Sequence, residues 1–327
     1  MLFGAGTRFA MLRRHSAARL PGRLLSSTKE TKIGVVGLGL MGHGVAQVSA
    51  MAGFNVVAVE AKDEFLATGK KRIEGSLGKV ISKNVQKGVY DESGGKKSYD
   101  EIMGRLTFTT KLEDLKNCDL IIEAIVENLP LKLDFYKKLG PLIKKDAIFC
   151  SNTSSLQITE MAKVSGRPAN FVGLHFFNPV QIMKLVEIIR NSETSDDTFN
   201  KVSAFGKTIG KVTVSCGDTP GFIVNRLLVP YLMQAMAMVD RKDASVADID
   251  VSMQLGAGHP MGPLHLADYI GLDTCLAIVE GWKVNYPNEP SFFVPKCLKD
   301  KVSAGKFGRK SGSGFYSWDG EKVGKPL

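Results

Sequence analysis

Short apolar runs alternate with segments of helical spacing along the first two thirds of this 327-residue chain. Such runs, bounded by glycine or polar residues, are typical of strands that are buried on both faces. They occupy residues 32–37, 55–60, 120–126, 147–150, 171–176, 184–189 and 212–215. Because strands that alternate with helices usually form a sheet covered by helices on both sides, we predict an α/β fold with a mainly parallel, doubly wound sheet.

The pattern changes after Gly217. From there to the C-terminus few strand-like runs occur, and helical segments are separated by breaks rich in glycine and proline. We therefore predict a first domain over residues 29–217 and a smaller, all-helical domain over residues 218–327. Within the first domain, residues 62–104 predict one long amphipathic helix, a loop near Gly94-Gly95 and a shorter helix.

A glycine-rich turn joins the first predicted strand to the helix that follows it. Its sequence is Gly37-Leu38-Gly39-Leu40-Met41-Gly42, and an acidic residue, Glu60, ends the next predicted strand. In Rossmann-type folds these glycines allow a tight turn, close approach to a pyrophosphate and close helix packing, while the acidic side chain binds the ribose hydroxyls. The arrangement predicts a Rossmann-type domain that binds NAD rather than NADP, although Lys62 lies close to Glu60. A purely structural turn is the alternative.

The charge is unevenly distributed. Residues 1–28 hold five arginines and no Asp or Glu, so they supply half of the formal net charge of +10. A basic, acid-free segment with serine, leucine and phenylalanine is typical of a mitochondrial transit peptide, and a basic tail is the alternative. We therefore predict a protein of the mitochondrial matrix. The remaining positive charge suits an anionic ligand but gives no support for nucleic-acid binding. No apolar run in the sequence is long enough for a membrane span.

The cysteines are odd in number and none forms a CxxC pair. They are Cys118, Cys150, Cys216, Cys275 and Cys297. This usage argues against a disulfide framework and against a zinc site, so no metal is predicted. Reduced thiols agree with a matrix location.

A histidine and a glutamate lie in two successive apolar runs. His175 is near the end of the run 171–176, and Glu187 lies inside the run 184–189. Oxidation of a secondary alcohol needs a base that takes the hydroxyl proton. An unpaired carboxylate inside a strand is costly, so we predict that Glu187 pairs with His175 and orients its ring. A structural histidine is the alternative.

Polar residues follow the run 147–150 directly, with the sequence Ser151-Asn152-Thr153-Ser154-Ser155. They could cap a helix, or they could present hydroxyl groups to a ligand at the carboxyl edge of the sheet. The sequence gives no support for two known classes of dehydrogenase. No tyrosine has a lysine four residues later, as the short-chain class requires, and the clustered Cys and His of zinc alcohol dehydrogenases are absent.

Several longer strings resemble one enzyme family. They are GLGLMGHG at 37–44, EAIVEN at 123–128, SNTSSLQ at 151–157, GLHFFNPV at 173–180, DTPGFIVNR at 218–226, MGP at 261–263 and FG at 307–308. With these strings the chain resembles the 3-hydroxyacyl-CoA dehydrogenases over nearly all of residues 32–316, especially the short-chain mitochondrial enzymes of fatty-acid β-oxidation. The resemblance implies NAD-dependent oxidation of a (3S)-3-hydroxyacyl-CoA thioester to 3-oxoacyl-CoA, and a homodimer formed by the helical domain.

The resemblance also implies roles for individual residues in the reaction. His175 would be the catalytic base and Glu187 its orienting partner. Ser154 and Asn225 would contact the substrate near the reacting carbon. Without the resemblance, Asn225 reads as a tolerated polar residue in a buried helix.

Further roles implied by the resemblance concern the cofactor and coenzyme A. The glycine turn and Glu60 would hold the adenosine half of NAD. The remaining cofactor site would be lined by Glu127, Lys132, Ser154, Asn178 and Lys310. Ser76 and Lys83, on the long predicted helix, would contact coenzyme A, although the sequence alone makes them an ordinary solvated helix face. One departure is His43 inside the glycine turn, where relatives often carry a small residue.

Two other functions remain compatible with the sequence. A related enzyme of the same fold would act on a free hydroxy acid or sugar acid, and a comparison of acyl-CoA with the free acid separates the two. A binding protein that kept the NAD fold would bind NADH without turnover. The presence of His175, Glu187, Ser154 and Asn225 together argues against that last function.

Overall fold

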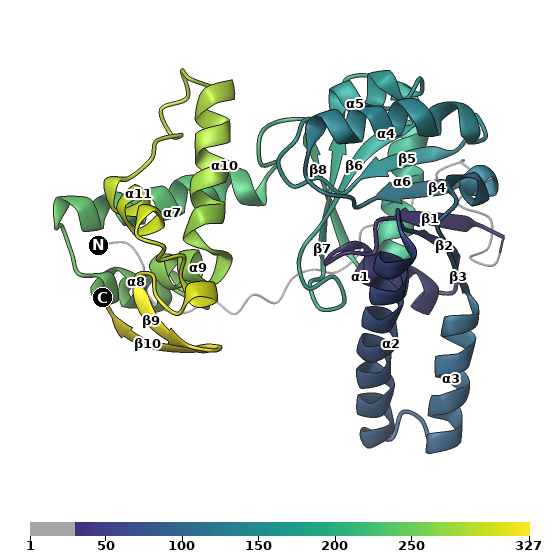
Figure 1. The fold of residues 1–327 in the computed structure, drawn as a ribbon, viewed down its shortest axis with the longest axis horizontal. Helices are drawn as coiled ribbons and strands as arrows, with labels where there is room; N and C mark the ends of the chain where they lie inside the picture. The colour runs from purple at the N-terminus through teal and green to yellow at the C-terminus, as the bar shows by residue number, and fades with distance from the viewer. Residues whose placement is uncertain (1–29) are drawn as a thin grey trace, which may run out of the picture.

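The computed structural model describes residues 30–327, which form two lobes (Figure 1). The larger lobe contains an eight-stranded sheet with the order β3-β2-β1-β4-β5-β6-β7-β8. Its strands are β1 (Lys32–Val36), β2 (Asn55–Val59), β3 (Leu106–Thr109), β4 (Leu120–Glu123), β5 (Ile148–Ser151), β6 (Phe171–Phe176), β7 (Leu185–Arg190) and β8 (Val212–Gly217). Strands β1 to β6 are parallel, whereas β7 pairs antiparallel with β6 and parallel with β8. The prediction of a mainly parallel sheet is confirmed.

Helices pack on both faces of the sheet. They are α1 (Gly42–Met51), α2 (Asp63–Gln86), α3 (Glu92–Gly104), α4 (Leu129–Leu142), α5 (Ile158–Val164) and α6 (Asp196–Thr208), with the 3₁₀ turns η1 (Leu112–Asn117) and η2 (Pro168–Asn170). Along β4, Leu120 and Ile122 join the core that contains α1 and α6, whereas Ile121 joins the core under α4 and α5. Apolar residues therefore run without a break through the strand because alternate side chains fill two different cores.

The prediction of a loop near Gly94-Gly95 is wrong. Both glycines lie inside α3, and the turn between α2 and α3 covers residues 87–91. Asp91 caps α3 by accepting a hydrogen bond from Gly94 N at 2.6 Å. A Cβ atom on Gly95 would lie 2.7 Å from Val85 Cγ2, so this glycine allows two helices to pack closely and does not mark a chain reversal.

The smaller lobe is mainly helical, as predicted. It contains α7 (Val224–Arg241), α8 (Val246–Ala257), α9 (Pro263–Ile270), α10 (Leu272–Asn285), α11 (Lys296–Ser303) and the 3₁₀ turn η3 (Arg309–Ser311). It ends in an antiparallel hairpin of β9 (Tyr316–Asp319) and β10 (Lys322–Pro326), which the all-helical prediction did not include.

A buried carboxylate anchors this hairpin. Asp268 on α9 accepts hydrogen bonds from Phe315 N and Tyr316 N, both at 2.9 Å, and from Trp318 Nε1 at 3.0 Å. Burial raises the pKa of Asp268 even though these hydrogen bonds act to lower it. The hairpin thus depends on a partner nearly 50 positions earlier in the chain, which a local pattern does not reveal.

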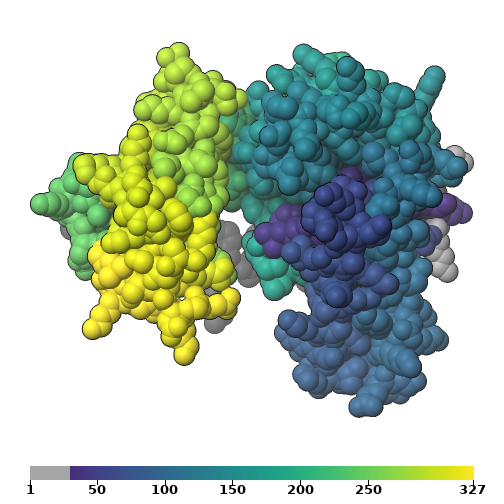
Figure 2. Space-filling view, viewed as in Figure 1, coloured from purple at the N-terminus to yellow at the C-terminus, as the bar shows by residue number. Residues whose placement is uncertain are grey.

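Residues 218–223 connect the two lobes, which meet over the upper part of their facing sides in the space-filling view (Figure 2). Within residues 30–327, no helix combines the length and the apolar character needed to cross a membrane. The predicted transit peptide, residues 1–28, lies outside the described residues.

Candidate active site

The glycine turn between β1 and α1 has the backbone geometry that a dinucleotide requires. Gly37 has a φ of +89°, and a Cβ atom on Gly42 would lie 1.7 Å from the Gly37 carbonyl oxygen, so a side chain at either position would force the turn to change. Gly39 differs, because no atom lies within 4 Å of the place that its Cβ would take. Open space beside this glycine fits the close approach of a pyrophosphate to the backbone.

Glu60 directly follows β2 and is half-buried. Its Oε1 accepts a hydrogen bond from Leu38 N at 2.6 Å, and its Oε2 accepts one from Ala61 N at 3.0 Å. The carboxylate therefore fixes the glycine turn and lies at the carboxyl end of β2, next to β1. Both features suit a residue that binds the ribose of a dinucleotide.

His175 and Glu187 face each other on the neighbouring strands β6 and β7, where they are register partners. The distance from His175 Nδ1 to Glu187 Oε2 is 2.7 Å, and both side chains are buried. Because the carboxylate oxygen accepts, Nδ1 carries the hydrogen, and Nε2 is the ring nitrogen available to take up a proton. The predicted contact between these two residues is present.

The second oxygen of Glu187 is also bound. Oε1 accepts hydrogen bonds from Ile223 N at 3.1 Å and Val224 N at 2.8 Å, at the start of α7. The N-terminus of a helix favours negative charge, so this contact stabilises the buried carboxylate. Phe177 and Phe222 pack against the imidazole ring at centroid distances of 4.5 and 5.5 Å, which keeps this side of the pair apolar.

Glu127 organises the polar segment after β5. Its Oε1 accepts hydrogen bonds from Thr153 Oγ1 at 2.6 Å and from Ser154 N at 3.0 Å. Burial would raise the pKa of Glu127, but the charge of Lys132 and these hydrogen bonds together lower it below its ordinary value. Asn225, in the first turn of α7, lies near the same segment, with 3.5 Å between its Nδ2 and Ser154 O.

A buried polar cluster beneath Glu127 was not predicted as a unit. Lys132 Nζ lies 2.6 Å from Glu123 Oε1 and 3.3 Å from Glu127 Oε2, so one buried ammonium joins two carboxylates. Glu123 also accepts hydrogen bonds from Ser151 Oγ at 2.7 Å and Tyr136 OH at 3.2 Å. The signal was available in the sequence, since Glu123 interrupts an apolar run in the same way as Glu187 does.

A chain of contacts thus links the central candidates. It runs through His175, Glu187, the start of α7 with Asn225, Ser154, Glu127 and Lys132. The other candidates take no part in it among the described residues. Asn178 is exposed after β6, Ser76 and Lys83 lie on α2, and Lys310 forms an ion pair of 2.5 Å with Asp273 in the smaller lobe.

Comparison with known families gives the site its context. The family model described as the NAD-binding domain of 3-hydroxyacyl-CoA dehydrogenase matches residues 32–219, and the model of the C-terminal domain of the same enzyme matches residues 221–318. The chain belongs to the 3-hydroxyacyl-CoA dehydrogenase family. It is therefore an oxidoreductase with an NAD-binding domain, as the glycine turn and Glu60 predicted.

Individual members of the family match over most of their length. A human protein named mitochondrial hydroxyacyl-coenzyme A dehydrogenase is 47% identical over 285 residues, which cover 87% of this chain and 90% of that protein. A probable 3-hydroxybutyryl-CoA dehydrogenase of Deinococcus radiodurans is 47% identical over 287 residues, or 88% of this chain and 100% of that protein. The crystal structure of (S)-3-hydroxybutyryl-CoA dehydrogenase from Ralstonia eutropha matches with a TM-score of 0.82 at 38% identity, over 89% of this chain and 100% of that chain.

Proposed function

We propose that the chain oxidises (3S)-3-hydroxyacyl-CoA to 3-oxoacyl-CoA in mitochondrial fatty-acid β-oxidation, with His175 as general base and Glu187 as its orienting partner. The observation that carries this proposal is the buried contact of 2.7 Å between His175 Nδ1 and Glu187 Oε2. A base must hold one ring nitrogen ready for the substrate, and a carboxylate on the other nitrogen fixes the ring in that tautomer.

The proton transfer follows from this geometry. His175 Nε2 takes the proton of the substrate hydroxyl, and Glu187 stabilises the imidazolium that results. NAD, when bound, accepts the hydride from the carbon that bears the hydroxyl. The amide groups of Ile223 and Val224 keep Glu187 in place throughout, because they occupy its other oxygen.

Ser154 and Asn225 supply polar groups beside the pair. Ser154 is exposed at the carboxyl edge of the sheet, and Asn225 begins the helix whose amides bind Glu187. In our proposal the Ser154 hydroxyl and the Asn225 amide donate to the oxygen that becomes the carbonyl. Donors that are positioned before the reaction stabilise charge on that oxygen at little cost.

In this proposal the carboxyl edge of the strands would hold NAD. The glycine turn and Glu60 would bind its adenosine half, and Glu127 with Lys132 would line the remaining cofactor site. Asn178 and Ser154, which follow two neighbouring strands, would line the same part of the site. Lys310 approaches from the smaller lobe, where Asp273 holds its ammonium group.

Coenzyme A is assigned to α2. Ser76 and Lys83 are seven positions apart, so they lie on one face of the helix, two turns from each other. The half-buried hydroxyl and the exposed ammonium would bind the polar and phosphate groups of coenzyme A. The ammonium group of a lysine is a point charge on a flexible side chain, which can bind a phosphate.

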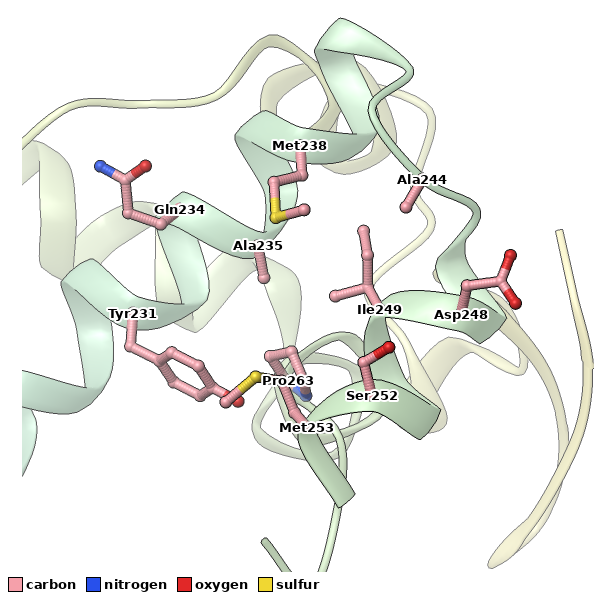
Figure 3. A pocket seen from close by; sticks show the side chains of 10 residues that line it. All are labelled: Tyr231, Gln234, Ala235, Met238, Ala244, Asp248, Ile249, Ser252, Met253 and Pro263. Atoms are coloured by element: carbon pink, nitrogen blue, oxygen red, sulfur yellow. The ribbon is translucent and has the colours of Figure 1, made fainter. Parts of the chain in front are cut away.

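We also propose that the smaller lobe forms a homodimer. Large apolar side chains are exposed there, among them Leu255 on α8 at 84% and Val284 on α10 at 79%. A pocket of about 230 Å³ opens between α7 and α8, with Met238 and Met253 among its lining residues (Figure 3). Exposed apolar surface of this kind is typical of a protein interface.

The matrix location belongs to the same proposal. It is supported by the basic composition of residues 1–28 and by mitochondrial relatives such as the human protein, whereas the Deinococcus relative is bacterial. Fusing residues 1–28 to a fluorescent protein tests it. We expect the fluorescence to coincide with a matrix marker, and an even distribution through the cytosol would contradict the proposal.

The reaction is tested by following NADH absorbance after acetoacetyl-CoA is added to the full-length protein. Free acetoacetate serves as the control substrate. We expect rapid loss of NADH with the thioester and none with the free acid. Loss with the free acid alone would favour the related hydroxy-acid enzyme, and NADH binding without any loss would contradict the proposed reaction.

A further inference from the structure

A row of hydrogen bonds joins the glycine turn to the segment 178–183, which connects the strands of His175 and Glu187. In the first turn of α1, His43 Nδ1 lies 2.8 Å from Gly39 O. The other ring nitrogen, His43 Nε2, lies 3.4 Å from Gln181 Nε2. Gln181 Nε2 also donates to Gln47 Oε1 at 3.0 Å. Three side chains thus connect two parts of the molecule that are more than 130 positions apart in sequence.

The donors and acceptors in this row are complementary when Nε2 of His43 carries no hydrogen. Gly39 O can only accept, so His43 Nδ1 carries the hydrogen, and Nε2 then accepts. The amide nitrogen of Gln181 has two hydrogens, one for His43 and one for Gln47. Rotation of that amide would point its oxygen at two acceptors, so the contacts fix the side chain of Gln181.

Packing holds the segment 178–183 against α1 as well. A Cβ atom on Gly44 would lie 2.7 Å from Val180 Cβ, so this glycine lets the segment contact the helix directly. From the other side, the buried Lys211 Nζ donates to Val180 O, and to Met183 O at 2.7 Å. The segment is therefore held from two directions, and only the α1 side is connected to the glycine turn.

We propose that His43 and Gln181 form a bridge that positions NAD, by fixing the glycine turn at Gly39 relative to the segment that carries Asn178. Gly39 has open space beside it for the pyrophosphate, and Asn178 lies three positions before Gln181. A cofactor that contacts both places binds more tightly when their spacing is set in advance, because less conformational entropy is lost on binding. Neither His43 nor Gln181 touches the reacting groups, so both are positioning residues.

The test measures NADH affinity by fluorescence titration, and the thermal midpoint Tm of the cofactor-free protein, in the full-length chain. The variants are His43→Ala, Gln181→Met, which keeps the length of the side chain, and the double variant. We expect each single change to raise the NADH Kd about 3- to 10-fold, the range that the loss of one hydrogen bond spans. The NADH Kd of the double variant should be no higher than that of the weaker-binding single variant, because either change alone breaks the bridge.

Two further measurements separate positioning from structure. Gln86→Met, at the exposed end of α2, is the matched control and should leave the NADH Kd unchanged. With saturating NADH, both single variants should keep kcat within about twofold of the unmodified protein while KM for NADH rises, since only cofactor binding is affected.

The proposed bridge is contradicted if the NADH Kd of both single variants equals that of the unmodified protein. It is also contradicted if the losses of NADH binding free energy in the two single variants add up in the double variant. A lower Tm without a change in Kd would assign the row to stability alone and would also overturn the proposal. The Kd and Tm measurements require no acyl substrate. A failure of the unmodified chain to turn over acetoacetyl-CoA would therefore contradict the reaction proposed above, not the bridge.

Discussion

Two glutamates interrupt apolar strands of this chain, and their neighbours differ in charge. Glu123 forms a buried ion pair of 2.6 Å with Lys132. Glu187 has His175 and two backbone amides as partners. Only the histidine among these partners can gain a charge during a reaction. Glu187 is therefore suited to support a proton transfer, and Glu123 is suited to hold Lys132 still.

Replacing the orienting carboxylate tests this assignment. Glu187→Gln keeps the size of the side chain but removes the negative charge that stabilises an imidazolium. We expect kcat for acetoacetyl-CoA reduction to fall about 100-fold or more, within the range of general acid–base contributions, and the NADH Kd to change less than twofold. His175→Ala should have a larger effect on kcat. A Glu187→Gln enzyme with nearly full kcat would remove Glu187 from the mechanism.

The lowered pKa of Glu127 predicts an acid-dependent stability. A carboxyl group whose pKa is lower in the folded state stabilises the fold above its ordinary pKa of 4.5, and this contribution disappears as the pH falls toward the lower folded value. In cofactor-free protein, the Tm advantage over Glu127→Gln should therefore be full at neutral pH and shrink below about pH 4.5. Thermal unfolding monitored by circular dichroism gives both Tm values. An advantage that is independent of pH would contradict the lowered pKa.

Two glycines of the same turn should respond differently to one added methyl group. Gly42→Ala places a Cβ against the Gly37 carbonyl oxygen, so it should lower stability by about 1–3 kcal/mol, as overpacking does, and weaken NADH binding. Gly39→Ala meets no protein atom within 4 Å. It should leave Tm nearly unchanged and still weaken NADH binding. Equal NADH affinity in Gly39→Ala and the unmodified protein would show that this space is not used by the cofactor.

The sequence predicted those parts of the structure that depend on neighbours along the chain or on adjacent strands. Seven of the eight strands of the large sheet and the glycine turn follow from local patterns, whereas the short strand β3 (Leu106–Thr109) was not predicted. The contact of His175 with Glu187 follows from two strands joined by a short connection. The cluster of Glu123 with Lys132 needed the position of α4 over β4. The hairpin anchored by Asp268 needed the packing of the smaller lobe. Gly95 was misread because close helix packing and a turn favour the same residue.

The proposed homodimer predicts that changing one exposed side chain, Leu255, alters the oligomeric state in solution. Leu255 is 84% exposed in the single chain, so Leu255→Glu should leave Tm of the isolated chain almost unaffected. If α8 lies in the interface, this charge should shift the mass in solution from dimer to monomer. Val89→Glu is the matched control, since Val89 is 60% exposed in the larger lobe. A monomeric unmodified chain, or a Leu255→Glu variant that remains dimeric, would contradict this interface.

The connection between the lobes is attached to the larger lobe at both of its ends. Asp218 accepts hydrogen bonds from Ile158 N at 3.0 Å and Thr159 N at 2.9 Å, and Ile223 N and Val224 N donate to Glu187. Surface connections usually tolerate insertions. Here the connection is held at Asp218 and at the first residues of α7, so one extra residue would have to be taken up between two fixed points or break one set of these hydrogen bonds. The length of the connection between Asp218 and Val224 is therefore constrained by the carboxylate of Glu187.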